Sequence, residues 1–534
     1  MTTINKYQIH QKEISYLEDI LLSSDLSKNE SINLSNYFYT KDNIYRMQGV
    51  NVQFSAERDL NQHDNLSVSF GHNYTSIKDR RIWFPFLLFK NPEEYIKKRE
   101  YSPKERFCSF VVFNPRGEMR NRFFDFVNKY KKVDSLGQFR RNCNDLINDT
   151  GRDIFSESYL NVLSKYKFMI CFENESTDYY LTEKLGNAYL AGCIPIYWGM
   201  KNVEHVINPK CFIHIRGEED FEEALNKIKE LDQDEEKYKE MFNEPLFRYN
   251  KVPYYFTKEW IVSQINKIIT IGGYDRNKDN DGIVEKTKVI SYCLYGTGEK
   301  YILGSIRNAE LAPLYYPTFE CWFYTDISVD QNIIEQLKKY DFVKIIYIDI
   351  RQYPNTNFTK CVRFLPMSDD SVELMLSRDT DSRFSIREVN AVIEWMKSGK
   401  TFHIIRDHPY HGYKILGGAW ASRKIRIRNN VSDTESASFV SFDFKEKMEI
   451  YKSVMGIWDV DQRFLIDKVY PIIREDSVIH DNYFKYESHA KDFPDDYIDY
   501  SFVGEYVNYV NIDGKLKEKR GDEWKFIKDH YLKK

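Results

Sequence analysis

The stretch NESTDYYLTEKLGNAYLAGCIPIYWG, residues 174–199, combines a predicted helix with a predicted strand. Thr182 suits the N-cap position of the helix, and Gly192 suits the residue that follows its end. Apolar positions between them recur at helical spacing. The runs KFMICFE at 167–173 and CIPIYWG at 193–199 read as strands on either side. The stretch therefore predicts a strand–helix–strand unit of a parallel α/β sheet.

Lys184 lies in the first turn of this predicted helix, where the backbone already carries partial positive charge. A lysine there is unfavourable unless an anion accompanies it. Ligands of open α/β sheets bind at the carboxyl ends of strands, and a helix N-terminus favours phosphate. The pattern predicts that a diphosphate supplies the anion and that Lys184 neutralises its charge as it leaves. An ordinary surface lysine is the alternative that the residues alone leave open.

Strands and helices alternate along most of the chain, which favours parallel α/β sheets. Residues 1 to about 45 predict an initial helix. Seven consecutive polar residues at 275–281, followed by Gly282, predict a linker between two tandem α/β regions. The predicted domains lie at 1–105, at 106–270 with a Rossmann-like fold, and at 285–534, with the linker at 271–284.

The composition excludes several classes of protein. The 534 residues include 77 basic and 81 acidic ones, with a formal net charge of −4, so no basic field points to a nucleic-acid partner. Eight cysteines occur without a CxxC pair, which favours buried reduced thiols. The sequence shows no signal peptide and no apolar run of about 18 residues. We therefore expect a cytoplasmic protein without a membrane span, and the Lys-, Asn- and Ile-rich composition favours a microbial or viral source.

The run FENESTDYYLTEKLGNAYLAGCIPIYWG at 172–199 resembles the signature of the α1,3/4-fucosyltransferase family, in which F-E-N, a Tyr, T-E-K, A and I-P-I-Y-W-G recur. The upstream run FCSFVVFNPRGEMRNRFFDFVNKYKKVDSLG at 107–137 is similar to the opening of that family's donor domain. We expect the resemblance to extend over about 50–270. It implies a GT-B arrangement of two Rossmann-type domains. It also implies inverting transfer of L-fucose from GDP-fucose to a glycan hydroxyl, with an α1,3 bond to N-acetylglucosamine expected.

The resemblance assigns roles to five residues of the donor-binding domain. It implies that Arg120 and Lys184 contact the diphosphate. Asn174, Tyr180 and Glu183 match positions that line the pocket for GDP and fucose. An arginine fork and a lysine charge both suit phosphate oxygens, so no metal is required at this site.

Inversion needs a general base that takes the proton of the acceptor hydroxyl. In the family this base is a glutamate of the acceptor domain, upstream of a D-x-a-x-g-F stretch. The run FSAERDLNQHDNLSVSFGHN at 54–73 fits that pattern loosely and places Glu57 in the base position, within an acceptor-side domain at 1–105. The alternative interpretation of Glu57 is an exposed carboxylate of a loop without a catalytic role. The segment before Glu57 is short for the family, which leaves the completeness of this domain open.

A second candidate site follows the apolar run VELML at 372–376. Asp379 and Asp381 form a D-x-D there, which can point two carboxylates at one divalent cation, Mn or Mg, that holds a nucleotide-sugar diphosphate. By similarity to metal-dependent transferases of the GT-A type, His480 is the predicted third ligand and Asp461 in WDVDQRFL is the predicted catalytic residue. A solvated turn is the alternative interpretation of the D-x-D.

The wider run at 363–420 is similar to an uncharacterised family of GT-A-like domains that carry R-D-x-D-S-R-x-S-x-R-E, F-H-I-x-R-D-H-P and I-L-G-G-x-W segments. We read His403, His408 and His411 as packing and acceptor contacts rather than a metal cluster. The combined prediction is a bifunctional glycosyltransferase, in which a second hexosyl transfer depends on a divalent cation. The alternatives are a non-catalytic glycan- or nucleotide-binding C-terminal module and a metallo-phosphotransferase.

Overall fold

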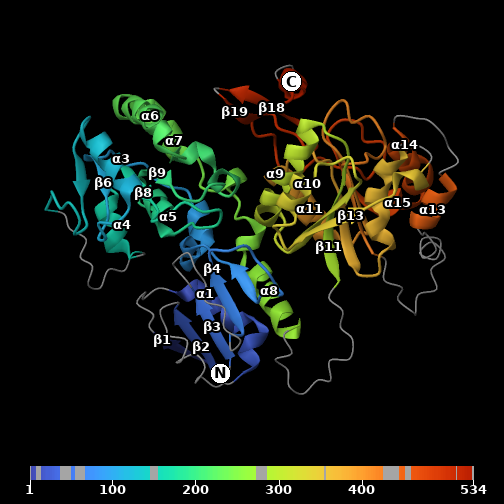
Figure 1. The fold of residues 1–534 in the computed structure, drawn as a ribbon. Helices are drawn as coiled ribbons and strands as arrows, with labels where there is room; N and C mark the ends of the chain where they lie inside the picture. Colours follow the sequence, from blue (N-terminus) through green and yellow to red (C-terminus); the bar gives the residue numbers. More distant parts are fainter. Residues whose placement is uncertain are drawn as a thin grey trace. The chain divides into compact units, whose positions relative to one another are not determined.

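The computed structural model describes residues 2–7, 14–29, 31–36, 50–54, 66–144, 154, 156–271, 286–353, 357–424, 444–451, 459–512 and 514–531. The chain divides into two compact units, Met1–Asp281 and Gly282–Lys534 (Figure 1). Glu57 lies outside the described residues, as do residues 272–284 of the predicted linker. The domain boundaries predicted at 105 and 270 stay predictions.

The first unit begins with a five-stranded parallel sheet whose strands lie in sequence order. Two of its strands are buried along their whole length, as expected of parallel strands that are covered on both faces; these are β3 (Val50–Phe54) and β4 (Val68–Gly71). The others are β1 (Thr3–Tyr7), β2 (Ser31–Asn36) and β5 (Arg81–Trp83).

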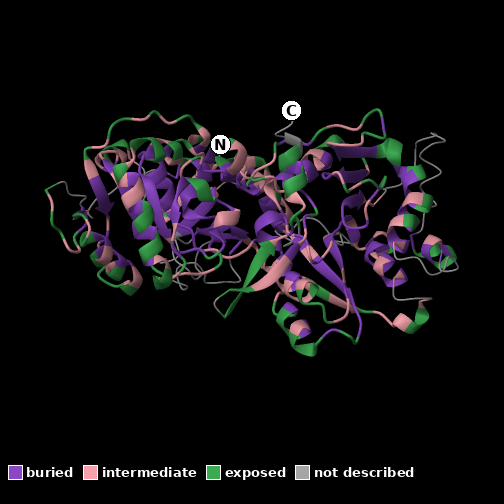
Figure 2. Cartoon of the chain, turned by 90° about the horizontal axis from the view of Figure 1, so that it is seen from above, coloured by how far each residue is buried: buried purple, intermediate pink, exposed green. Residues whose placement is uncertain are grey.

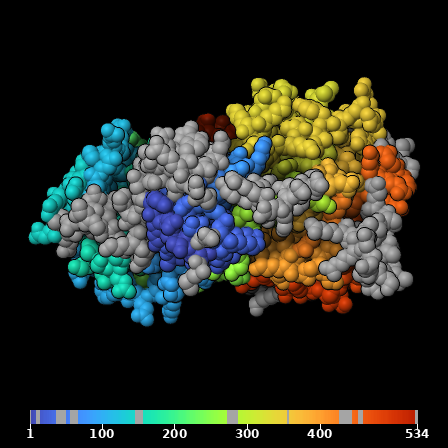
Figure 3. All heavy atoms as spheres, turned by 90° about the horizontal axis from the view of Figure 1, so that it is seen from below, coloured from blue at the N-terminus to red at the C-terminus, as the bar shows by residue number. Residues whose placement is uncertain are grey.

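The first element of the chain is a strand, so the predicted initial helix is wrong. Helix α1 (Ser15–Ser23) comes second, after β1. Five partly exposed residues are too few for hydrophobic periodicity to separate a strand from a helix. β1 lies at the edge of its sheet, and Figure 3 shows the N-terminal residues, in dark blue, at the molecular surface.

The second sheet of this unit is also parallel, with the strand order β10–β9–β8–β6–β7. After β6 the chain first forms β7 on one side and then crosses to form β8 on the other side. The strand order therefore reverses between β6 and β8, and ligands of such sheets bind at the carboxyl ends of the strands at this point. The bounds are β6 (Arg106–Phe110), β7 (Val133–Ser135), β8 (Tyr166–Phe172), β9 (Ile194–Trp198) and β10 (Ile213–His214).

Helices cover this second sheet, and Figure 2 shows buried residues concentrated in the strands while the outer helices carry the exposed ones. The charged stretch at 221–242 forms two helices that meet at Asp234, whose carboxylate accepts hydrogen bonds from the N–H groups of Glu236 and Lys237. The helices are α3 (Glu118–Asn128), α4 (Glu157–Leu163), α5 (Glu183–Leu190), α6 (Phe221–Gln233), α7 (Glu235–Asn243) and α8 (Lys258–Ile271).

The second unit contains a seven-stranded sheet with the order β13–β12–β11–β14–β16–β15–β17. β16 runs antiparallel to both of its neighbours, and the other pairs are parallel. The bounds are β11 (Thr287–Leu294), β12 (Phe319–Thr325), β13 (Val343–Tyr347), β14 (Val372–Ser377), β15 (Phe402–Arg406), β16 (Trp420–Arg423) and β17 (Ser477–Asp481). A separate antiparallel hairpin is formed by β18 (Val507–Ile512) and β19 (Lys515–Arg520).

The helices of the second unit lie between and after these strands. They are α9 (Glu299–Tyr315), α10 (Gln331–Leu337), α11 (Ile386–Ser398), α13 (Phe444–Tyr451), α14 (Val460–Phe464), α15 (Tyr470–Ile473) and α16 (Trp524–Tyr531), with the 3₁₀ helix η10 (Phe358–Ser368). The mixed α/β class with parallel strands is as predicted, while the GT-B and GT-A arrangements stay predictions. Among the helices that the structure describes, none combines the length and the apolar character needed to cross a membrane.

Candidate functional site

Helix α5 begins and ends where the sequence predicts. Thr182 occupies the N-cap position, and Gly192 follows the helix with a φ of +73°, which favours glycine. The hydroxyl of Thr182 does not cap the helix, however. It donates a hydrogen bond to Oε2 of Glu173 at 2.7 Å. Glu173 comes directly after β8, so the carboxyl end of this strand is tied to the start of α5.

Glu173 also binds the ammonium group of Lys184. This carboxylate is completely buried and accepts hydrogen bonds from Nζ of Lys184 at 2.9 Å and from the backbone N–H of Thr182 at 2.8 Å. Burial would lower the pKa of Lys184, but Glu173 and Glu183 outweigh it and raise the pKa. Glu173 thus provides an anion beside Lys184 that the sequence analysis did not foresee, and the predicted contact with a diphosphate stays a prediction. The Lys184 side chain is 23% exposed, so it is the accessible member of this ion pair.

Arg120 of α3 reaches the same end of the sheet. It is buried, and its guanidinium donates hydrogen bonds from Nη1 to Oδ1 of Asn174 at 2.8 Å and from Nη2 to the carbonyl oxygen of Asn114 at 2.6 Å. Gly117 has a φ of +115°, and a Cβ there would lie 2.6 Å from Nε of Arg120. The turn before α3 therefore needs glycine in order to close over the guanidinium.

The other predicted donor residues lie nearby. Burial lowers the pKa of Arg120, while Tyr180 and Glu173 oppose this, so these groups lie close enough to interact. Tyr180 is buried, with its ring edge-on to His72 at a centroid distance of 4.8 Å. Glu183 lies 3.9 Å from Nζ of Lys184. All five predicted donor residues therefore lie in the segments that follow β6 and β8, at the carboxyl ends of these strands.

A hollow of the first unit lies away from these residues. It measures about 850 Å³ and is bordered by β10, α6 and α7, with Lys210, His214 and Glu223 among its residues. Burial lowers the pKa of His214 to about 4. None of the predicted donor residues lines this hollow, so its size does not make it the candidate site.

The second unit contains a cavity of about 500 Å³ at the D-x-D segment. Asp379 and Asp381 line it, as predicted from their place after β14, and Asp461 lines it from α14. Aromatic packing holds these elements in place. Phe364 of η10 lies against Trp420 of β16, with ring centroids 5.5 Å apart, and against Phe464 of α14 at 6.2 Å.

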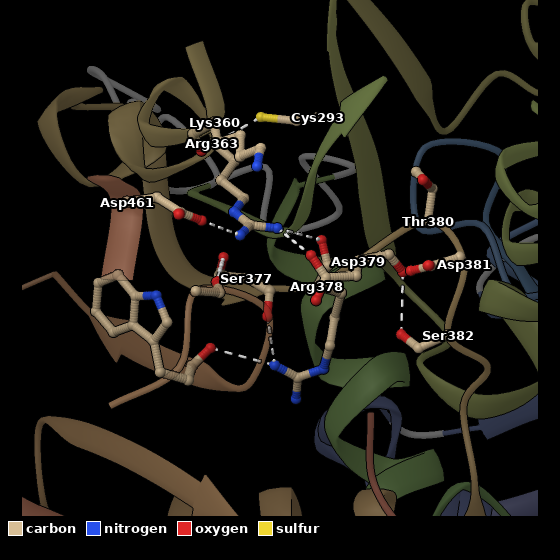
Figure 4. A network of polar contacts seen from close by, with 12 residues as sticks. Cys293, Lys360, Arg363, Ser377, Arg378, Asp379, Thr380, Asp381, Ser382 and Asp461 are labelled. Atoms are coloured by element: carbon tan, nitrogen blue, oxygen red, sulfur yellow. Dashed lines mark hydrogen bonds and ion pairs between the residues drawn. The ribbon is translucent and has the colours of Figure 1, made fainter. Parts of the chain in front are cut away.

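Two cationic side chains hold the carboxylates of this cavity, Arg363, which Figure 4 shows, and Lys300. Arg363 binds Oδ1 of Asp379 through Nη1 and Oδ2 of Asp461 through Nη2, the latter at 2.7 Å. Lys300 of α9 binds Oδ2 of Asp381 at 2.7 Å. Burial and the neighbouring Asp379 raise the pKa of Asp381, while Lys300 opposes the increase. The sequence analysis gave no role to Arg363 or Lys300, although Arg363 is the first residue of the run at 363–420.

The structure does not bring His480 to the D-x-D pair. His480 is buried on β17, three strands from β14, which corresponds to about 14 Å at the usual strand spacing. Its Nδ1 lies 2.8 Å from Nε2 of His403, and its Nε2 lies 3.2 Å from Oε2 of Glu394. In the described part of the chain, no group of three or more His, Cys, Asp or Glu side chains is arranged to hold a metal ion.

The remaining histidines of this region have structural partners, in keeping with their interpretation as packing residues. Nε2 of His408 lies 3.0 Å from the carbonyl oxygen of Glu523. His411 accepts a hydrogen bond from the N–H of Asp407 at 3.2 Å and lines the cavity. Burial lowers the pKa of His411 to about 3, so its ring is neutral near pH 7.

Comparison with solved structures gives weak similarity. A crystal structure of alpha1,3-fucosyltransferase with GDP-fucose aligns at 20% identity and a TM-score of 0.37, over 50% of this chain and 90% of that one. The apo structure of the bifunctional glycosyltransferase WbbM aligns at 9% identity and a TM-score of 0.23, over 71% and 86% of the two chains. Similarity at this level carries no conclusion about function.

Sequence comparison is more informative for the first unit. The chain is 32% identical over 214 residues to the putative fucosyltransferase R654 of Acanthamoeba polyphaga mimivirus, covering 38% of this chain and 35% of that protein. It is 37% identical over 141 residues to the alpha-(1,3)-fucosyltransferase FucT of Helicobacter pylori, covering 26% and 28%. It is 30% identical over 188 residues to the human 4-galactosyl-N-acetylglucosaminide 3-alpha-L-fucosyltransferase 9, covering 34% and 48%.

The chain thus spans less than half the length of each of these relatives. The profile of glycosyltransferase family 10 (fucosyltransferase), C-terminal part, matches residues 101–267. This range includes Arg120, Glu173 and Lys184, which lie together at the carboxyl ends of strands β6 and β8 in the second sheet. Residues 101–267 of this chain are a glycosyltransferase family 10 (fucosyltransferase) domain.

Proposed function

We propose that the first unit transfers L-fucose from GDP-fucose to a glycan hydroxyl, with an α1,3 bond to N-acetylglucosamine. The observation that carries this proposal is the pairing of a family 10 domain with two cationic side chains, Arg120 and Lys184, at the switch point of its sheet. The names of the Helicobacter pylori and human relatives state 3-linked fucose transfer, the human one to a galactosyl-N-acetylglucosaminide.

In this mechanism the acceptor oxygen attacks the anomeric carbon of fucose, and the bond from that carbon to the β-phosphate oxygen breaks. Negative charge grows on the departing GDP, and Arg120 and Lys184 stabilise it. Glu173 holds the ammonium of Lys184 at the start of α5. Both cations belong to the chain itself, so this site requires no metal. We assign the acceptor proton to Glu57, as the family resemblance implies.

The test is the release of GDP from GDP-fucose by the full chain in the presence of an N-acetyllactosamine acceptor. We expect Glu57→Gln to lower turnover by about 100- to 10,000-fold, the usual contribution of a general base, with unchanged affinity for GDP-fucose. Glu94→Gln, which changes an exposed carboxylate paired with Lys97, is the control. No GDP release by a folded sample with any β-galactosyl–N-acetylglucosamine acceptor would contradict the proposal.

We further propose that the second unit carries out a metal-dependent hexosyl transfer. The observation that favours this is the cavity with Asp379 and Asp381 after β14 and Asp461 on α14. The donor set fits Mg²⁺ or Mn²⁺, which bind one or two carboxylates together with substrate phosphates. Asp379 and Asp381 would hold the cation without His480, and the bound cation would stabilise the charge of a departing nucleotide. Asp461 is the proposed catalytic residue.

A non-catalytic glycan- or nucleotide-binding module is the rival function of this unit. The two are separated by a panel of nucleotide sugars other than GDP-fucose, tested on the full chain with Mn²⁺. A transferase should lose turnover in the Asp379→Ala variant, whereas a binding module should show no turnover to lose. Asp370→Ala, which removes a fully exposed aspartate bound to Lys424, serves as the matched control.

A further inference from the structure

Arg363 joins two carboxylates that come from distant parts of the second unit. It lies on η10 and is only 5% exposed, yet it lines the cavity. Its Nη1 binds Asp379, next to β14, and its Nη2 binds Asp461, on α14. The third nitrogen, Nε, is buried and has no hydrogen-bond partner in the described part of the chain. Two of the three guanidinium nitrogens are thus held by carboxylates.

The backbone closes tightly over this cluster. Gly417 and Gly418 come from the I-L-G-G-x-W segment. A Cβ on Gly417 would lie 2.6 Å from Oδ2 of Asp461, and a Cβ on Gly418 would overlap the carboxylate of Asp379. The hydroxyl of Ser377 donates a hydrogen bond to the carbonyl oxygen of Gly417 at 2.6 Å. The pairing of Arg363 with the two aspartates is thus built into the packing.

The same carboxylates are the ones proposed to hold a divalent cation. In the structure each of them already has a cationic partner, because Arg363 binds Asp379 (Figure 4) and Lys300 binds Asp381. Asp379 is also the more accessible of the two, with 49% of its side chain exposed against 15% for Asp381. A cation that enters the cavity therefore meets Asp379 first and has to compete with Arg363 for it.

We propose that Arg363 is an internal counter-ion that binds Asp379 in the metal-free protein and releases it when a divalent cation binds. The inference rests on the proposed metal-dependent function of this cavity. The bond to Asp461 keeps the guanidinium in place after release. Its N–H groups then face the cavity, where a donor phosphate can accept hydrogen bonds from them. Arg363 thus opposes binding of the cation and favours binding of the diphosphate.

This opposition gives a test that does not depend on activity. Mn²⁺ is titrated into the full chain without nucleotide, and free Mn²⁺ is measured by electron paramagnetic resonance. Arg363→Gln should bind Mn²⁺ at least about tenfold more tightly than the wild type, because a positive charge a few ångströms from the cation is removed. UDP affinity at saturating Mn²⁺ should fall in the same variant. A residue with a purely structural role would weaken both.

Two further variants keep the test decisive. Arg363→Lys retains the charge but cannot span both carboxylates, so a severalfold tighter Mn²⁺ affinity is expected even if Arg363→Gln fails to fold. Adding Asp379→Asn to either variant should remove the gain. Arg351→Gln, at an exposed arginine paired with Asp349, should change nothing.

Unchanged or weaker Mn²⁺ binding in a folded Arg363 variant would overturn the inference, as would a gain that persists with Asp379→Asn. Mn²⁺-dependent hexosyl transfer in the wild type together with that result would leave the proposed function intact and remove only the role of Arg363. If the Arg363 variants show the predicted change in Mn²⁺ affinity but the wild type transfers no sugar, the role of Arg363 would stand and the proposed hexosyl transfer would be contradicted.

Discussion

The two candidate sites use the same kinds of groups with opposite orientation. In the family 10 domain the carboxylate of Glu173 is completely buried, and the ammonium of Lys184 is the partly exposed member of the pair. In the second unit the guanidinium of Arg363 is buried, and the carboxylate of Asp379 is half exposed. The Lys184–Glu173 pair thus turns its cation toward solvent, and the Arg363–Asp379 pair turns its carboxylate toward solvent. The Lys300–Asp381 pair of the second unit, with side chains 33% and 15% exposed, is oriented like the first.

This difference explains why the two sites are expected to treat a nucleotide diphosphate differently. Outward cations can bind phosphate oxygens directly. Outward carboxylates repel them unless a divalent cation lies between. Both carboxylates follow a strand, Glu173 directly after β8 and Asp379 two residues after β14, and they differ in burial.

Chelation should give the largest contrast between the two sites. We expect EDTA to abolish nucleotide-sugar turnover by the second unit and to leave fucose transfer unchanged, because Arg120 and Lys184 cannot be removed by a chelator. Both activities are measured on one sample of the full chain, and Mn²⁺ added back in excess should restore the lost one. Fucose transfer that depends on metal would break the comparison.

Removing either cation of the first site should have the next largest effect. Lys184→Ala and Arg120→Ala are each expected to lower kcat for fucose transfer by about 30- to 1,000-fold, the usual loss for one group that stabilises a departing charge. Lys239→Ala, at a lysine of α7 paired with Glu236, is the control. If both variants keep wild-type turnover, the diphosphate does not bind at the carboxyl ends of β6 and β8.

Neutralising the buried carboxylate of Glu173 should strengthen the binding of GDP, whereas loss of a cation should weaken the site. In Glu173→Gln the amide can still accept a hydrogen bond from Lys184, but the ammonium no longer shares its charge with a carboxylate. We expect the Kd for GDP to fall by about three- to tenfold, and the free energy of unfolding to fall by about 1–3 kcal/mol through the lost charged hydrogen bonds. Calorimetric titration with GDP and thermal unfolding measure the two effects, and weaker GDP binding by a folded variant would contradict the assigned role.

The sequence predicted the first site better than the second for a physical reason. Helix α5 and strands β8 and β9 are local elements, so periodicity, Thr182 and Gly192 were enough to place them. Glu173 was visible beside Asn174, but a sequence does not show that its carboxylate turns inward toward Lys184. The second site depends on contacts between segments far apart in sequence. Arg363 and Asp461 are 98 residues apart, and the pairing of η10 with α14 cannot be read from spacing.

His480 illustrates the same limit. Similarity to GT-A transferases predicted it as a metal ligand, but the order of strands in a sheet decides which strand ends are neighbours. β16 and β15 lie between β14 and β17, so His480 packs against His403 rather than near Asp379. The prediction of an initial helix was wrong for a local reason. The five residues of β1 are too few for their hydrophobic pattern to identify a strand.

The smallest predicted effect concerns acid stability. The second unit should be the weaker one, because it contains two histidines with a strongly lowered pKa, His480 and His411, whereas His214 is the one described above in the first unit. Burial lowers the pKa of His480 to about 4 and that of His411 to about 3, against about 6.5 in an unfolded chain. Below pH 6.5 the unfolded state therefore binds protons that the folded state does not, and stability falls with pH until the folded-state pKa is reached. Each histidine contributes a slope of up to about 1.4 kcal/mol per pH unit.

Hydrogen exchange measured by mass spectrometry between pH 7 and 5 can follow this loss in peptides of β15 and β17, after correction for the intrinsic pH dependence of exchange. His480→Gln keeps a polar group between His403 and Glu394 but cannot be protonated, so it should reduce the slope by about 1 kcal/mol per pH unit. His489→Gln, at a histidine bound to the carbonyl oxygen of Arg474, is the control. An unchanged slope in His480→Gln would mean that this buried pair does not set the acid sensitivity of the second unit, and the contrast between the two units would then rest on the two sites alone.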